Sequence, residues 1–194
     1  GRQNNGANLT VVNGLVLNGT LYLGNATNSW WGQVGFVGTQ TLGGNGTVIL
    51  GNQGTCNALR VDTAGTTLTI GSGITVRGHS GQIGQSTGCI GSPANVTVIN
   101  QGTLAADVSG GTIYLRAQSF ANQGSVDAQK GTINFYGTYS LAGGTLALGI
   151  TGPTDFGNIN FVNPLTMQGT LKAQFIGFYR PTSGSSFTLL TYPS

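Results

Sequence analysis

The chain of 194 residues contains 35 glycines, and charged residues make up only 6% of it. Its net charge is +3, and its seven basic residues form no run. Nucleic-acid interfaces need clustered Lys and Arg, so no nucleic-acid partner is expected. Hydrophobic residues make up 38%, which is enough apolar surface to favour a folded, turn-rich β protein over a disordered chain. No apolar stretch approaches the roughly 20 residues of a membrane-spanning helix, so the chain is not expected to span a membrane.

Short strands that open with Gly-Thr and an aliphatic residue recur along the chain. The segment Asn18–Asn25 returns 27 positions later, and Asn100–Leu104 returns 22 positions later as Asn122–Val126. Further strands of the same kind are expected at Gly111–Ile113, Gly131–Ile133, Gly144–Leu146 and Gly169–Leu171. Apolar residues alternate with polar ones within these strands, as in Thr67–Ile70, which is typical of a strand with one buried face.

The repeats favour a coil over a sandwich of hairpins. In a coil each turn lies on a chemically matching neighbour, whereas a sandwich does not require similar sequence to return at such intervals. We therefore predict an all-β, right-handed parallel β-helix of roughly eight turns with little or no helix. One domain spans 1–194: N-terminal turns with a Trp-containing insertion (1–45), regular rungs (46–148) and C-terminal turns with a cap-like end (149–194).

The two cysteines, Cys56 and Cys89, allow a single pairing. A disulfide is favoured over two buried thiols, and it implies an oxidising compartment outside the cytoplasm. The chain has one histidine and no Cys-x-x-Cys motif, so no metal site is predicted. The first residues are not typical of a signal peptide and the chain ends abruptly, so a segment of a longer protein is expected.

The stretch Asn100–Phe135 resembles the N-Q-G-T, G-G-T-I and F-x-N-Q-G repeats of large bacterial exported proteins, both autotransporter passenger-like and filamentous-adhesin-like. The loop at Val76–Gly84 looks like one that is common in the same proteins. The segment Gly177–Leu190 is similar to the G-F-x-P-x-x-G-x-x-F-x-L-L ending that follows such repeats. The resemblance runs from Gly46 onward. It implies a β-helical segment of a secreted or cell-surface protein and says nothing about a substrate.

Two adjacent tryptophans, Trp30 and Trp31, lie in a segment that lengthens its repeat. Neighbouring residues of an extended strand point to opposite faces, so one of the two should point outward. An exposed Trp beside Tyr22 or Phe36 would form a flat stacking platform for sugar rings. The alternative is that both tryptophans cover the end or flank of the coil, whose terminal turn needs protection.

The acids do not suggest a catalytic pair. Glycoside hydrolysis needs two carboxylates about 5–10 Å apart across a cleft, and polysaccharide lyases of this architecture cluster Asp residues around calcium. Aligning the repeats places Asp127 against Ala105 and leaves Asp107 offset along the same face. The one histidine, His79, lacks the partners of a recognisable catalytic motif. No catalytic residue and no cofactor is predicted.

Three functions therefore remain for the chain. The first is a non-catalytic structural or adhesive segment of a large secreted or cell-surface bacterial protein. The second is a carbohydrate-binding module that uses the exposed aromatic residues, with a polysaccharide or a host or cell-surface glycan as partner. A polysaccharide lyase or hydrolase is supported only by analogy of fold. The sequence leaves the oligomeric state open.

Overall fold

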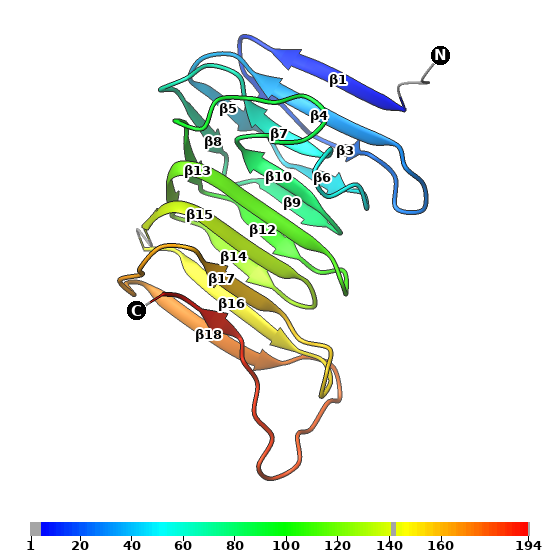
Figure 1. Ribbon diagram of the computed structural model, residues 1–194, viewed down its shortest axis with the longest axis vertical. Helices are drawn as coiled ribbons and strands as arrows, with labels where there is room; N and C mark the ends of the chain where they lie inside the picture. Colours follow the sequence, from blue (N-terminus) through cyan, green and yellow to red (C-terminus); the bar gives the residue numbers. More distant parts are fainter. Residues whose placement is uncertain (1–4, 141–142, 194) are drawn as a thin grey trace.

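The strands are stacked along the long axis of the molecule, from the N-terminal end to the C-terminal end (Figure 1). The structure is a computed structural model that describes residues 5–140 and 143–193. These residues form 19 strands and no helix. The strands belong to a sheet of 12 and a sheet of 7, and every pairing between named strands is parallel. The predicted all-β parallel β-helix is confirmed.

The coil has three faces, because two long strands carry the larger sheet around a corner. The long strands are β13 (Thr112–Asn122) and β15 (Thr132–Ser140). Their first parts lie on the first face with β1 (Gly6–Val11), β4 (Trp31–Phe36), β7 (Ala58–Val61), β10 (Gly81–Gly84), β17 (Asn158–Phe161) and β19 (Leu190–Thr191). Their last parts lie on the second face with β2 (Leu15–Val16), β5 (Gln40–Gly43), β8 (Thr67–Ile70) and β11 (Thr97–Asn100). The third face is the smaller sheet: β3 (Thr20–Leu23), β6 (Gly46–Leu50), β9 (Ile74–Gly78), β12 (Thr103–Ala106), β14 (Ser125–Ala128), β16 (Thr145–Ile150) and β18 (Thr170–Phe175).

The Gly-Thr openings stack on one another along the third face. The register joins the threonines and one serine into a single column: Thr20, Thr47, Thr75, Thr103, Ser125, Thr145 and Thr170. From Thr47 to Thr145 the residue after each of them points inward and is fully buried, as Val76, Leu104 and Val126 are. At the two ends of the column, Leu21 is half-buried and Leu171 is exposed. Each buried aliphatic side chain stabilises the coil by about 1.5–3 kcal/mol relative to exposure. Each repeat therefore contributes one residue to an outward column of hydroxyl side chains and the next residue to an inward column of aliphatic side chains.

The Asn-Gln-Gly segments turn the corner between the second and third faces. The Asn100 amide donates to the Asn122 carbonyl oxygen at 2.9 Å, and the Asn122 amide donates to the backbone oxygen of Thr145 at 3.0 Å. Both asparagines are fully buried, and buried backbone oxygens need such partners. The glycine at the corner is required because a Cβ at Gly124 would collide with the backbone oxygen of Gly102.

A disulfide joins Cys56 and Cys89, whose Cα atoms are 5.0 Å apart, so the predicted pairing is confirmed. It ties the loop before β7 (51–57) to the loop after β10 (85–96), and both loops lie over the outer face of β4, β7 and β10. Figure 1 shows the green loop after β10 passing in front of the first turns. The described residues include no helix long and apolar enough to cross a membrane.

Candidate functional site

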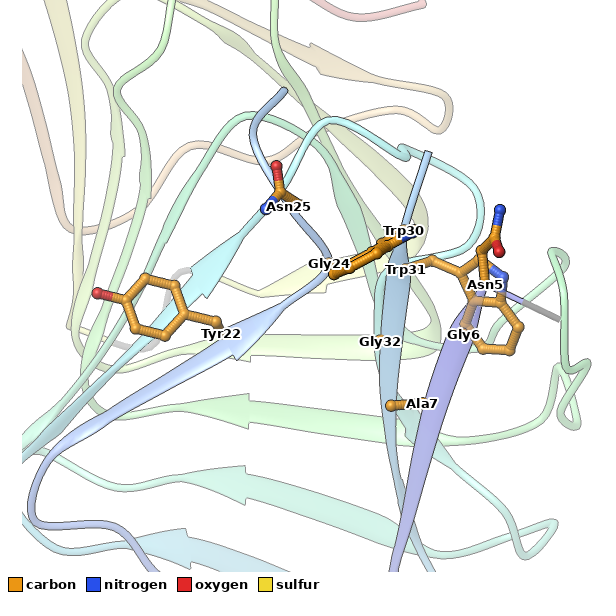
Figure 2. Close-up of a pocket in the computed structure, with 9 residues that line it drawn as sticks. All are labelled: Asn5, Gly6, Ala7, Tyr22, Gly24, Asn25, Trp30, Trp31 and Gly32. Carbon is orange, nitrogen blue, oxygen red and sulfur yellow. The ribbon is translucent and has the colours of Figure 1, made fainter. Parts of the chain in front are cut away.

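A hollow of about 470 Å³ opens beside the first turns, where β3 leads into β4. Figure 2 shows the residues around it. Its lining consists of Asn5, Gly6, Ala7, Tyr22, Gly24, Asn25, Trp30, Trp31 and Gly32. Three of the four aromatic residues predicted to form a stacking platform therefore surround one hollow.

The loop between β3 and β4 is closed by its own asparagines. The carboxamide oxygen of Asn25 accepts a hydrogen bond from the backbone N–H of Thr27 at 2.8 Å. The carboxamide oxygen of Asn28 accepts one from the N–H of Trp30 at 2.9 Å. A backbone hydrogen bond joins the two ends of the loop: the N–H of Asn25 donates to the backbone oxygen of Trp30. Asn side chains favour such turns because they substitute for backbone partners, and here they fix the position from which Trp30 projects.

The two tryptophans lie on opposite sides of the chain at the start of β4 (Figure 2). The side chain of Trp31 is half-buried and packs over β1, where a Cβ at Gly6 would overlap its ring. Trp30 is 58% exposed. The prediction that one of the two points outward is confirmed, and Trp31 is the one that covers the flank of the coil.

Tyr22 shares the hollow but stands apart from the Trp30 ring in Figure 2. It is 68% exposed and also lines a neighbouring hollow of about 410 Å³ beside Ile49 and Leu50. Phe36 was expected to join the platform, and this expectation is wrong because Phe36 is 0% exposed in the core. The strand begins at Trp31, and its alternation turns every second residue outward, which points Phe36 inward.

The acids of the third face are separate from one another. Asp107 forms an ion pair with Arg77 and accepts a hydrogen bond from the backbone N–H of Gly78 at 3.1 Å. Asp127 lies in register with Ala105, as the repeat alignment predicted, and accepts a hydrogen bond from the Gln129 amide at 2.8 Å. The two carboxylates therefore do not form a stacked pair.

The remaining acids and the histidine also have local partners. Asp62 forms an ion pair with Arg60; burial raises the pKa of its carboxyl, and the nearby guanidinium opposes that shift. The pKa of Asp155 is lowered, chiefly by the hydrogen bond from the Thr151 hydroxyl. The Nδ1 atom of His79 shares a hydrogen bond with the adjacent serine at 2.7 Å. In residues 5–140 and 143–193, no three His, Cys, Asp or Glu side chains are grouped to hold a metal ion.

A second aromatic cluster, not predicted from the sequence, lies on the first face. The guanidinium carbon of Arg116 lies 4.0 Å from the centre of the Tyr136 ring and 5.3 Å from that of Tyr114. Aligning Thr112–Arg116 with Thr132–Tyr136 brings Arg116 against Tyr136, and the register has this pairing. The 20-residue offset between these two strands was the available signal.

Comparison of the chain with protein-family models, with curated proteins and with solved structures finds no match.

Proposed function

We propose that the chain is a non-catalytic, adhesive β-helical segment of a larger secreted or cell-surface bacterial protein. The observation that carries this proposal is the exposure of Trp30, with Tyr22, around a hollow where an otherwise regular coil is interrupted. The disulfide supports an oxidising environment. The resemblance of the Asn-Gln-Gly-Thr repeats to those of exported proteins supports the surface location.

The coil suits a role in adhesion because it holds its contact residues rigidly. Trp and Tyr supply large contact areas in binding interfaces and dominate their energetics. The loop that carries Trp30 is fixed by hydrogen bonds to Asn25 and Asn28, so little conformational entropy is lost when a partner binds. Contact residues held on a rigid scaffold are better preorganised for binding than residues on free loops.

A carbohydrate-binding module is the second candidate, and the composition of the hollow favours it. The hollow combines the exposed ring of Trp30 with the polar side chains of Asn5 and Asn25. Ligand sites commonly combine aromatic surface with a few polar groups that orient the ligand, and a sugar ring offers one apolar face and several hydroxyl groups. The partner would be a polysaccharide or a host or cell-surface glycan.

The test is binding of the folded protein to a glycan array and to insoluble polysaccharides. Trp30→Ala should lower binding by about tenfold or more, the loss typical of an interface hot spot, with an unchanged melting temperature. Phe178→Ala is the matched control because Phe178 is fully exposed and lies outside the hollow. Binding that survives Trp30→Ala would overturn the role of the hollow. Product release from a polysaccharide, abolished by Asp107→Ala or Asp127→Ala, would overturn the non-catalytic assignment.

A further inference from the structure

The guanidinium of Arg116 lies over two tyrosine rings on the first face. Its guanidinium carbon is 4.0 Å from the centre of the Tyr136 ring, and the centres of the Tyr114 and Tyr136 rings are 6.4 Å apart. A cation over an aromatic face is stabilised by about 0.5–2 kcal/mol, depending on how far it is desolvated. The stacking therefore orients the planar guanidinium before any ligand arrives.

The charge of Arg116 is not neutralised within the part of the chain that the structure describes. Arg60 and Arg77 each pair with an aspartate, whereas Arg116 has no carboxylate within 4 Å among the described residues. Its Nε atom is buried and has no hydrogen-bond partner there. A guanidinium stays charged at all ordinary pH values, and its N–H groups match the two oxygens of a carboxylate. An oriented and unpaired guanidinium is suited to bind such an anion.

Neutral polar groups continue from this cation across the following turns. Tyr114 is in register with Asn134, which is in register with Asn160. The Asn160 amide donates to the Asn134 carbonyl oxygen at 2.9 Å, and the Thr191 hydroxyl donates to the Asn160 carbonyl oxygen at 2.5 Å. These groups are spaced by one strand, about 4.8 Å, and offer donors and acceptors along a line.

We propose that this strip, Tyr114, Arg116, Tyr136, Asn134 and Asn160, binds a carboxylate-bearing glycan. The sugar carboxylate pairs with Arg116, and the hydroxyl groups of neighbouring rings bond to the Asn134–Asn160 ladder. One cation among amides and aromatic rings fits an acidic sugar better than a polyanion, which requires clustered basic residues. That the partner is a glycan rests on the proposed adhesive function, whereas the choice of a carboxylate rests on Arg116 itself.

The test measures binding of oligoglucuronate, oligogalacturonate and sialyllactose by titration calorimetry, each against its carboxyl-reduced counterpart. At least one acidic form should bind about tenfold or more tightly than its reduced form, as expected for a charge-assisted hydrogen bond. Arg116→Gln should abolish that difference. Arg116→Lys should restore only part of it because lysine lacks the planar fork. The control is Arg180→Gln, which removes the same charge at an exposed site in the C-terminal segment and should change nothing.

Three outcomes overturn the inference. One is that no acidic glycan binds more tightly than its reduced form; another is that Arg116→Gln leaves the difference intact. The third is that polyglutamate or dextran sulfate binds with the same dependence on Arg116, which would remove the sugar or the carboxylate from the assignment. Trp30→Ala separates the two proposals: loss of all glycan binding in Trp30→Ala but not in Arg116→Gln would leave the adhesive function standing without this site.

Discussion

The outer side of the first face differs between its two halves. Every residue of β7 and β10 is buried. In the first part of β13 and in all of β17, buried residues alternate with half-exposed ones. The strands themselves follow the same parallel register from one half to the other. The difference comes from the two loops joined by Cys56 and Cys89, which cover the first half and leave the second half open.

One outward column illustrates the contrast. Gln82 and Asn134 both lie in register with Tyr114. The Gln82 side chain is fully buried, and its amide donates to the Thr55 backbone oxygen at 2.5 Å. Asn134 is half-exposed and belongs to the ladder beside Arg116. An outward position on the coil can therefore hold a second, polar core or form a binding surface, depending on which loops lie above it.

Removal of the disulfide should have the largest effect. The Cys56→Ser, Cys89→Ser double variant frees two loops whose linked residues are 33 positions apart. We expect the free energy of unfolding to fall by about 2–4 kcal/mol, measured by urea denaturation. Each turn of a coil contacts mainly its neighbours, so hydrogen exchange should increase in β4, β7 and β10 and much less in β15 and β17.

The same variant also tests whether the two halves are independent. Treatment of the wild-type protein with a reducing agent is the matched control, because it removes the bond without changing the sequence. A uniform loss of protection from β4 to β17 would contradict the distinction between a covered and an open half, and would indicate a single cooperative unit.

The sequence predicted the coil because the repeats record its columns directly. The Asn-Gln-Gly-Thr segment at Asn100 marks a corner where the asparagine points inward and the following Gly-Thr begins the third face. The cysteine count fixed the only possible pairing. The position of the 85–96 loop could not be predicted, because it depends on long-range contacts such as Ser86 to the Gln33 amide at 3.4 Å. In the sequence Gln33 is indistinguishable from an exposed polar residue.

The candidate site was predictable only in part, for a related reason. Strand alternation predicts that one of Trp30 and Trp31 is exposed, and Trp30 is, although it lies in the loop just before β4. The first residue of β4 is set by the preceding loop, however, and without it the orientation of Phe36 was uncertain by one position. The pairing of Arg116 with Tyr136 depends on a 20-residue offset, whereas the repeat beginning at Asn100 has an offset of 22. An alignment that used one repeat length throughout would not have paired Arg116 with Tyr136.

The variants Gln82→Ala and Asn134→Ala compare the loss of unfolding free energy at an outward position covered by the loops with the loss at an open one. The first change leaves the Thr55 oxygen and the Thr87 backbone N–H, which bond to Gln82, without their partner. Buried polar groups left unsatisfied cost about 1–3 kcal/mol. Asn134→Ala should cost about 0.5 kcal/mol or less, as at other surface positions. Thermal and urea unfolding of both variants give the comparison, and equal losses would mean that the loops do not exclude water.

A small effect at neutral pH is expected at Tyr139, which lies in the aromatic core of the open half. Its ring packs against Phe135, with ring centres 4.6 Å apart. Burial raises the pKa of the Tyr139 hydroxyl above its ordinary value, an effect that the Asn122 amide only partly offsets. The folded state therefore holds this proton more tightly than the unfolded state. The resulting stabilisation is complete below the ordinary pKa of about 10 and is lost as the pH rises above it.

Tyr139→Phe has no proton to lose at this position, so it should remove that part of the alkaline destabilisation. At pH 7 the free energy of unfolding should change by about 1 kcal/mol or less. Between about pH 10 and 11 the wild-type protein should lose up to about 1.4 kcal/mol more than the variant. Tyr22→Phe, at a tyrosine that is 68% exposed, is the control and should keep the wild-type alkaline slope. If Tyr139→Phe and the wild-type protein lose stability in parallel above pH 10, the Tyr139 hydroxyl is hydrated and the aromatic core beneath the open half is not closed to water.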